Sequence, residues 1–340
     1  MRSSPIGMLL RCVRLALAIG WQRLRGIRHG PRDLRAAVLS RLLRRDIREV
    51  VERGIPRLRA SELATPVWPS VKRQVAFERG DVGGVPGLWI TPRDPAPDAA
   101  SGASPTLVYF HGGGYCFCSS ATHRAMVAQI ALAGGCRSFV PDYRLAPEHP
   151  HPAAIEDALA VVRGLMASGI SADELVIGGD SAGGGLSLAT LVALREAGDP
   201  LPRAAVLLSP WVDLACTGAS IVRNAQHDYL TREILDHFAQ CYLGETNPLA
   251  PSASPLYADL HGLPPLLIQV GALETLLSES RRLAEHAAAA GVTVELQELE
   301  DAVHVSQAFA PMVPAASRAI QDIGRFIGRS FTPSTPSARP

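Results

Sequence analysis

The stretch Leu175–Gly185, which reads LVIGGDSAGGG, decides the fold. An apolar run enters the pattern Gly-x-Ser-x-Gly, and a segment with helical spacing leaves it. A strand that turns this sharply into a helix strains the residue at the turn and exposes its side chain, while Gly179 and Gly183 leave room for neighbouring backbone. The pattern predicts that Ser181 stands on such a turn and acts as a nucleophile.

A second glycine-rich stretch, Tyr109–Tyr115 (YFHGGGY), also follows an apolar run. Successive glycines expose backbone N–H groups with no Cβ in the way, which suits donation to an oxyanion. A phosphate-binding loop would continue with Lys and then Ser or Thr, and no such pair follows here. We predict the N–H groups of Gly113, Gly114 and Ala182 as oxyanion donors, the last because it begins the next helix. His111 is predicted to organise this loop rather than to act as a base.

Three histidines follow far enough beyond the serine to serve as its base: His261, His286 and His304. His286 lies among alanines on a predicted helix and is expected at the surface, and His261 lies in a turn where a structural role is expected. His304 follows a strand predicted at residues 292–296 and precedes the last helix. A loop in that position emerges at the same sheet edge as the strand-to-helix turn at Ser181, called the elbow below. The sequence therefore predicts His304 as the base.

An acid that orients the histidine should lie between the serine and the histidine in the chain. Glu274 is the first carboxylate beyond the strand predicted at residues 266–270, so it can reach the edge of the site. Glu279 comes one turn later and is expected to be solvated. Asp301 is close to His304 in sequence, but adjacency in a loop does not place its carboxylate against Nδ1. We predict Glu274 as the acid and leave Asp301 and Glu279 as alternatives.

The chain beyond Pro105 alternates short apolar runs with longer helical patterns, which predicts a mostly parallel sheet covered on both faces by helices. Before it, Val71, Val75 and Phe77 are expected on one face of an extended chain, followed by an antiparallel hairpin through residues 82–90. The predicted strands are 107–110, 139–140, 175–177, 205–208, 266–270 and 292–296, and the predicted helices are 123–133, 153–166, 182–196, 280–290 and 316–327.

The domain organisation follows from where this alternation holds. Residues 1–60 are predicted to form a helical cap segment, and residues 61–330 the catalytic domain. The segment at about 215–251 interrupts the alternation with a predicted helix at 232–242, which indicates an insertion that completes the cap. Residues 92–105 form a predicted surface connection, and the Pro- and Ser-rich residues 331–340 a disordered tail.

Composition excludes several classes of function. A net charge of +1 over 340 residues gives no electrostatic case for nucleic acid. The six cysteines show neither disulfide-scaffold nor zinc-site spacing, and no metal or cofactor is expected. Arg11 and Arg14 interrupt the apolar stretch 8–21, so no bilayer span or export signal is expected and a cytoplasmic location is predicted. Contact of the basic N-terminal helices with a membrane surface stays open, as does the choice between monomer and homodimer.

Several of these motifs resemble the hormone-sensitive-lipase-like branch of the α/β hydrolases, the bacterial carboxylesterase family. The resemblance covers roughly residues 107–326 and rests on five stretches: HGGGY at 111–115, PDYRLAPEHPHPAAIEDA at 141–158, GDSAGG at 179–184, GALETLLSES at 271–280 and DAVHVSQAF at 301–309. It implies an α/β-hydrolase fold, a nucleophile at Ser181, a histidine at His304, oxyanion donors in the glycine loop and N-terminal helices that form part of a cap.

One departure from the family affects the acid. The family carries Asp-Pro-Leu at that position, where this chain has Glu274-Thr275-Leu276. Glutamate is one methylene longer but can orient an imidazole through the same hydrogen bond. A separate set of residues in the second motif is predicted to form a supporting ion-pair and hydrogen-bond network: Asp142, Tyr143, Arg144, Glu148 and Asp157.

The constellation predicts a serine carboxylesterase that acts through an acyl-enzyme, and the resemblance implies short to medium acyl chains. Two alternatives stay open. The same machinery serves acetyl amides and lactones, and a non-catalytic small-molecule receptor is known on this fold. A receptor can dispense with the histidine, whereas this chain fills every position of the predicted triad.

Overall fold

The computed structural model describes residues 5–27, 30–56, 59, 66–94 and 105–332. An eight-stranded sheet runs through it in the order β1-β2-β4-β3-β5-β6-β7-β8. β1 and β2 form an antiparallel hairpin, β2 pairs antiparallel with β4, and all the other pairs are parallel. The strands are β1 Val75–Val82, β2 Val85–Pro92, β3 Thr106–Phe110, β4 Arg137–Pro141, β5 Leu175–Asp180, β6 Ala204–Leu208, β7 Leu266–Gly271 and β8 Val294–Leu299.

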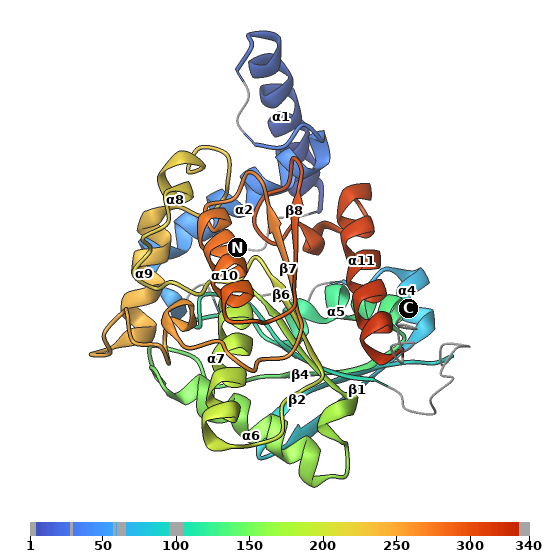
Figure 1. Cartoon of the computed structure of the whole chain (residues 1–340). Helices are drawn as coiled ribbons and strands as arrows, with labels where there is room; N and C mark the ends of the chain where they lie inside the picture. The colour runs from blue at the N-terminus through green and yellow to red at the C-terminus, as the bar shows by residue number, and fades with distance from the viewer. Residues whose placement is uncertain (1–4, 28–29, 57–58, 60–65, 95–104, 333–340) are drawn as a thin grey trace, which may run out of the picture.

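The central strands are continuous apolar runs because helices cover both of their faces. Every residue of β3, β5, β6 and β7 is buried. The helices around the sheet are α4 Pro69–Gln74, α5 Ser120–Gly134, α6 Ala153–Ala167, α7 Ala182–Ala197, α10 Leu277–Ala289 and α11 Pro314–Phe331. α5 and α11 pack together on one face, and α6, α7 and α10 lie on the other (Figure 1). This arrangement confirms the predicted fold class.

Most predicted elements are present, with differences of a few residues at their ends. Val71 lies in the short helix α4 and not in an extended chain, because Pro69 starts a helical turn just before β1. β8 begins at Val294, two residues late, since the Val292 amide donates to Ala287 O and completes the end of α10. α10 itself starts at Leu277, earlier than expected. Most of the connection at 92–105, and the tail from 333, lie outside the described residues.

The two segments predicted to form the cap are both helical. The N-terminal segment contains α1, Pro5–Leu24, and α2, Leu34–Arg53, and the insertion contains α8, Ser220–Arg223, and α9, Arg232–Leu243. α2 contacts α9, so segments far apart in sequence meet above the sheet. In Figure 1, α1 extends from α2 away from the rest of the molecule.

One face of α1 lies in solvent. Leu17, Trp21 and Leu24 are 60–84% exposed, while Ile19 on the other face is buried against α2. None of the helices in the described residues combines the length and the apolar character needed to cross a bilayer. Contact of this face with a membrane surface stays a prediction.

The turn of the β1–β2 hairpin sets how closely α6 approaches the sheet. A Cβ on Gly164 of α6 would lie 2.7 Å from the backbone nitrogen of Gly83 in that turn, and one on Gly83 only 2.1 Å from Ala160 O. Gly83 also has a φ of +63°, which glycine adopts without strain. Neither contact involves a flexible side chain that could move aside, so the backbone itself would have to shift.

We therefore expect Gly164→Ala to lower the free energy of unfolding by about 1–3 kcal/mol, although alanine favours a helix more than glycine does. Gly328→Ala in α11 is the matched control, because a Cβ there meets nothing within 4 Å. Urea unfolding followed by circular dichroism measures both changes. Equal stability of the two variants would contradict the close approach of α6 to the hairpin.

Candidate active site

Ser181 forms the turn between β5 and α7. Its φ of +53° is a strained value for a residue with a side chain, and the surrounding backbone holds it there. The Ser181 amide donates to Leu208 O at 2.9 Å, and its carbonyl accepts from the amides of Gly185 and Trp211. A Cβ on Gly183 would lie 2.0 Å from Phe110 O, so glycine is required beside the serine. The predicted elbow is therefore confirmed in its geometry.

The glycine loop between β3 and α5 approaches the serine from the neighbouring strand. Gly113 and Gly114 have φ values of +111° and +57°, and both residues line the pocket that contains Ser181. Their N–H groups make no hydrogen bond with any described residue. Ala182 is the first residue of α7, where helix geometry leaves the N–H without an intrahelical partner. These unpaired donors are what an oxyanion requires.

His304 and Glu274 form a buried pair beside the serine. The His304 Nδ1 lies 2.7 Å from Glu274 Oε2, with side-chain exposures of 3% and 0%. The other carboxylate oxygen, Oε1, accepts from the Ser209 hydroxyl at 2.8 Å and from the Gly271 amide. Both oxygens are thus held, which fixes the direction in which the carboxylate faces the imidazole.

The environment of His304 acts on its pKa in two directions. Burial lowers the pKa, but the hydrogen bond and the negative charge of Glu274 outweigh it, so that the pKa lies above the ordinary histidine value. His304 also lines the pocket together with Ser181. The structure shows no hydrogen bond between these two side chains, a contact that in ligand-free enzymes often tightens only when substrate binds.

The alternative acids lie elsewhere. Asp301 turns outward, where its carboxylate accepts from the backbone amides of Arg32 and Asp33. Glu279 was expected to be solvated, and this is wrong: it is 2% exposed, because the earlier start of α10 turns its first turn inward. Its carboxylate accepts from the Asp213 amide, and burial raises its pKa well above the ordinary value. No described contact joins Asp301 or Glu279 to His304.

Two polar residues near the pair were missed from the sequence. Asp228 is 1% exposed, and its carboxylate accepts from the His304 amide at 3.2 Å and from the amide and hydroxyl of Thr275. Burial raises the pKa of Asp228 to about 6. Ser209 donates to Glu274 and accepts from the Val305 amide. Ser209 directly follows β6, a position that could have signalled it, whereas no motif marks Asp228.

The other histidines have different surroundings. His111 is buried, its Nδ1 lies 2.8 Å from Gly112 O, and its ring stacks on Tyr143 at 4.3 Å between centroids. Burial lowers its pKa to about 4, so it is neutral near pH 7 and serves to organise the loop, as predicted. His286 is half-buried rather than fully at the surface, with Nδ1 3.0 Å from Leu256 O. His261 is exposed in its turn.

A further histidine, His123, was not considered from the sequence. Its Nε2 lies 3.3 Å from the carboxylate of Asp180, the residue before Ser181. Asp180 also accepts from the Tyr109 hydroxyl at 2.9 Å and from the Gly112 amide at 3.2 Å. This buried carboxylate therefore ties the glycine loop to the serine elbow and fixes their separation.

The predicted supporting network is confirmed for Asp142, Tyr143, Arg144 and Asp157 but not for Glu148. Arg144 holds Asp157 at 2.9 Å, and Asp142 accepts from Arg79 at 2.6 Å and from the Ser120 amide. The Tyr143 hydroxyl donates to His111 O at 2.7 Å, so the network is hydrogen-bonded to the glycine loop. Glu148 was predicted to belong to this network but pairs with Arg59 instead, at 2.9 Å.

The pocket above the serine has a volume of about 190 Å³ and a mostly apolar wall. Its lining comes from the loop, the elbow, the predicted cap and the 304–308 region. Residues of the predicted cap on this wall include Leu43 and Ile47 of α2, Tyr229 and Leu230 before α9, and Leu235 and Phe238 of α9.

Comparison with known proteins agrees with this geometry. Residues 107–308 match the family described as having an alpha/beta hydrolase fold. A crystal structure of an esterase from the bacterial hormone-sensitive lipase family superposes with a TM-score of 0.75 at 42% identity, covering 98% of this chain and 100% of that one. This chain belongs to the α/β-hydrolase family, in its hormone-sensitive-lipase branch.

Curated relatives of this α/β hydrolase carry related names. An acetyl-hydrolase of Streptomyces hygroscopicus is 45% identical over 223 residues, which are 65% of this chain and 75% of that protein. A carboxylesterase of Mycobacterium tuberculosis is 33% identical over 275 residues, 78% of this chain and 85% of that protein. The family thus places the chain among the carboxylic ester hydrolases.

The pairing of this hydrolase's His304 with Glu274 has a measurable consequence. In Glu274→Gln the negative charge is lost, so only the charges of Asp228 and Asp180 still oppose the effect of burial, and the pKa of His304 should fall below the wild-type value. Titration of ¹³C-labelled histidine by NMR measures this shift. Glu285→Gln, an exposed position on α10, is the control and should leave the His304 pKa unchanged. An unchanged pKa in Glu274→Gln would mean that the carboxylate does not stabilise the imidazolium.

Proposed function

We propose that the protein is a serine carboxylesterase for short- to medium-chain acyl esters, with Ser181 as nucleophile, His304 as base and Glu274 as the orienting acid. The observation that carries the proposal is the buried 2.7 Å contact between His304 Nδ1 and Glu274, with the imidazole and Ser181 lining one pocket. Nucleophile, base and orienter in this relation support acyl transfer through a covalent intermediate.

The proposed reaction has two halves. His304 Nε2 takes the proton of Ser181 as Oγ attacks the ester carbonyl, and the oxyanion is held by the N–H groups of Gly113, Gly114 and Ala182. His304 then protonates the departing alcohol. Water, activated by the same imidazole, attacks the acyl-enzyme and releases the acid, while Glu274 stabilises the imidazolium in both halves.

The pocket volume supports a small acyl group. At about 190 Å³ it lies below the range of about 300–1,000 Å³ typical of sites for drug-sized ligands. One solved relative, a structure of EstE5 soaked with p-nitrophenyl butyrate, is 37% identical with a TM-score of 0.79. α2 and the insertion at 215–251 supply the wall opposite the serine, which supports their role as a cap that limits chain length.

A second candidate is release of acetyl groups from amides. The relative named acetyl-hydrolase favours an acetyl donor, and the same nucleophile, base and oxyanion donors would serve an amide bond. The leaving group separates the two, because the amine of an amide is a much poorer leaving group than the alcohol of an ester. Assays with matched acetyl esters and acetyl amides compare them directly.

Ser181→Ala tests the proposal. Hydrolysis of p-nitrophenyl esters from acetate to palmitate should be highest for short chains in the wild type. Turnover should fall roughly 10⁴-fold or more in the variant, since the acyl-enzyme cannot form. Ser187→Ala is the matched control, a buried serine of α7 whose hydroxyl donates only to Gly183 O. Near-normal esterase activity in Ser181→Ala would exclude this residue as the nucleophile.

A further inference from the structure

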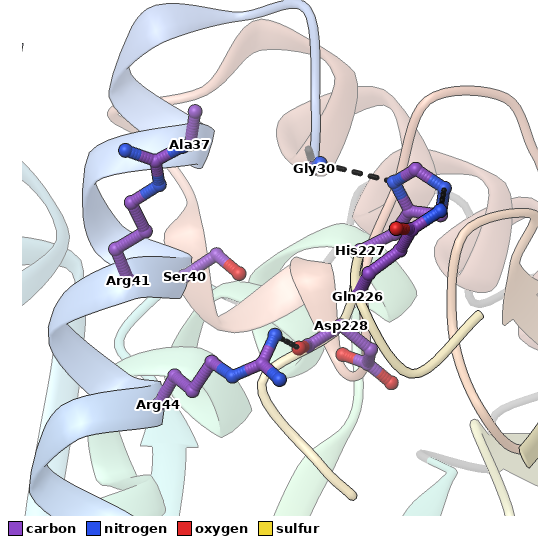
Figure 2. A pocket seen from close by; sticks show the side chains of 8 residues that line it. All are labelled: Gly30, Ala37, Ser40, Arg41, Arg44, Gln226, His227 and Asp228. Carbon is purple, nitrogen blue, oxygen red and sulfur yellow. Dashed lines mark hydrogen bonds between the residues drawn. The ribbon is translucent and has the colours of Figure 1, made fainter. Parts of the chain in front are cut away.

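A second cavity lies between α2 and the segment 226–228 and has a volume of about 490 Å³ (Figure 2). It shares no lining residue with the pocket of Ser181, although α2 forms a wall of both. Its wall consists of Gly30, Ala37, Ser40, Arg41, Arg44, Gln226, His227 and Asp228. The proposed reaction uses none of these side chains, so the cavity needs an explanation of its own.

The cavity carries an excess of positive charge. Arg41 and Arg44 line it, and in the described part of the chain neither guanidinium pairs with a carboxylate. Burial and the charges of Arg23 and Arg44 lower the pKa of Arg41, which shows that like charges gather here. Asp228 is the one carboxylate among the described lining residues, and its oxygens already accept from His304, Thr275 and Tyr229.

The hydroxyl of Ser40 is a donor without a partner. Ser40 is only 5% exposed, and its hydroxyl makes no hydrogen bond with any described residue. Figure 2 shows this hydroxyl extending from α2 towards the segment 226–228. Because this hydroxyl lines the cavity and makes no hydrogen bond within the described chain, it can donate to an acceptor that enters there.

The two guanidinium groups also keep donors for such an acceptor. Arg41 donates from Nη2 to the Gln22 side chain at 2.6 Å, and Arg44 donates from Nη1 to Asp228 O at 3.1 Å. A guanidinium has five N–H groups, so each retains several. Planar guanidinium groups bind carboxylate and phosphate oxygens in paired hydrogen bonds.

We propose that this cavity binds a small oxyanion, held by Arg41, Arg44 and the Ser40 hydroxyl. Two sources share this chemistry: inorganic phosphate, and the carboxylate product of ester hydrolysis. Binding of phosphate is independent of the proposed function, whereas feedback by a product acid rests on it.

The site is connected to the proposed base. Arg44 holds the backbone carbonyl of Asp228, and the carboxylate of the same residue accepts from the His304 amide. An anion that attracts the Arg44 guanidinium weakens the hydrogen bond between Arg44 and the Asp228 carbonyl. This shifts Asp228 and hence the position of His304. Occupancy of the cavity therefore alters the rate of ester hydrolysis.

Calorimetric titration of the full chain carrying Ser181→Ala tests binding without turnover. Phosphate, acetate and butyrate are titrated separately, with sodium chloride keeping ionic strength constant. We expect saturable binding of phosphate or of the carboxylates. Arg44→Gln should weaken this binding at least about tenfold, and so should Ser40→Ala, which is the smaller change in structure. Arg45→Gln removes the same charge from an exposed position of α2 and should bind as tightly as the parent.

The outcomes separate the two sources and the coupling. Binding of phosphate alone identifies a phosphate site, and binding of acetate or butyrate that Arg44→Gln weakens identifies the product acid. Absence of saturable binding, or equal loss in Arg45→Gln, overturns the site. With Ser181 restored, a bound anion that leaves kcat/KM for p-nitrophenyl acetate unchanged overturns the coupling, and a wild type with no esterase activity overturns the proposed function alone.

Discussion

The buried contact between Glu274 and His304 is the interaction on which the rest of the site depends. A carboxylate with 0% exposure is costly unless hydrogen bonds replace its water, and here Ser209, Gly271 and His304 do so. These partners come from the ends of β6 and β7 and from the loop after β8. The parallel sheet brings these three chain segments to one edge, so the contact between Glu274 and His304 depends on the fold.

Close backbone approach is the second constraint. The turn at Ser181 fits against β3 only because no side chain stands at Gly183, and Asp180 then fixes the distance to the glycine loop. The strain at Ser181 is balanced by the hydrogen bonds of its own amide and carbonyl. Ser181 is thus placed by packing of strands and a helix, which a mobile loop could not achieve with the same accuracy.

Most of the fold and of the candidate site could be predicted from the sequence, because its strongest signals are local. The run into Gly-x-Ser-x-Gly, the three glycines at 112–114 and the alternation of strands and helices each depend on a few neighbouring residues, and the fold class could be predicted from them. The burial of Glu279 could not be predicted, because it depends on the residue at which α10 begins. The role of Asp228 could not be predicted either, since its partners Thr275 and His304 are 47 and 76 residues away in the chain and no motif joins them.

Asp228 also gives a physical reason for the departure of this chain from the Asp-Pro-Leu of its family. Thr275 stands where the family has proline, and its amide donates to Asp228 at 2.9 Å while its hydroxyl donates at 3.1 Å. Proline has no N–H and could make neither bond. The longer Glu274 side chain reaches His304 while also accepting from Ser209. The exchange of Asp-Pro for Glu-Thr thus keeps the contact with the imidazole and adds two donors to a second buried carboxylate, which in turn holds the His304 backbone.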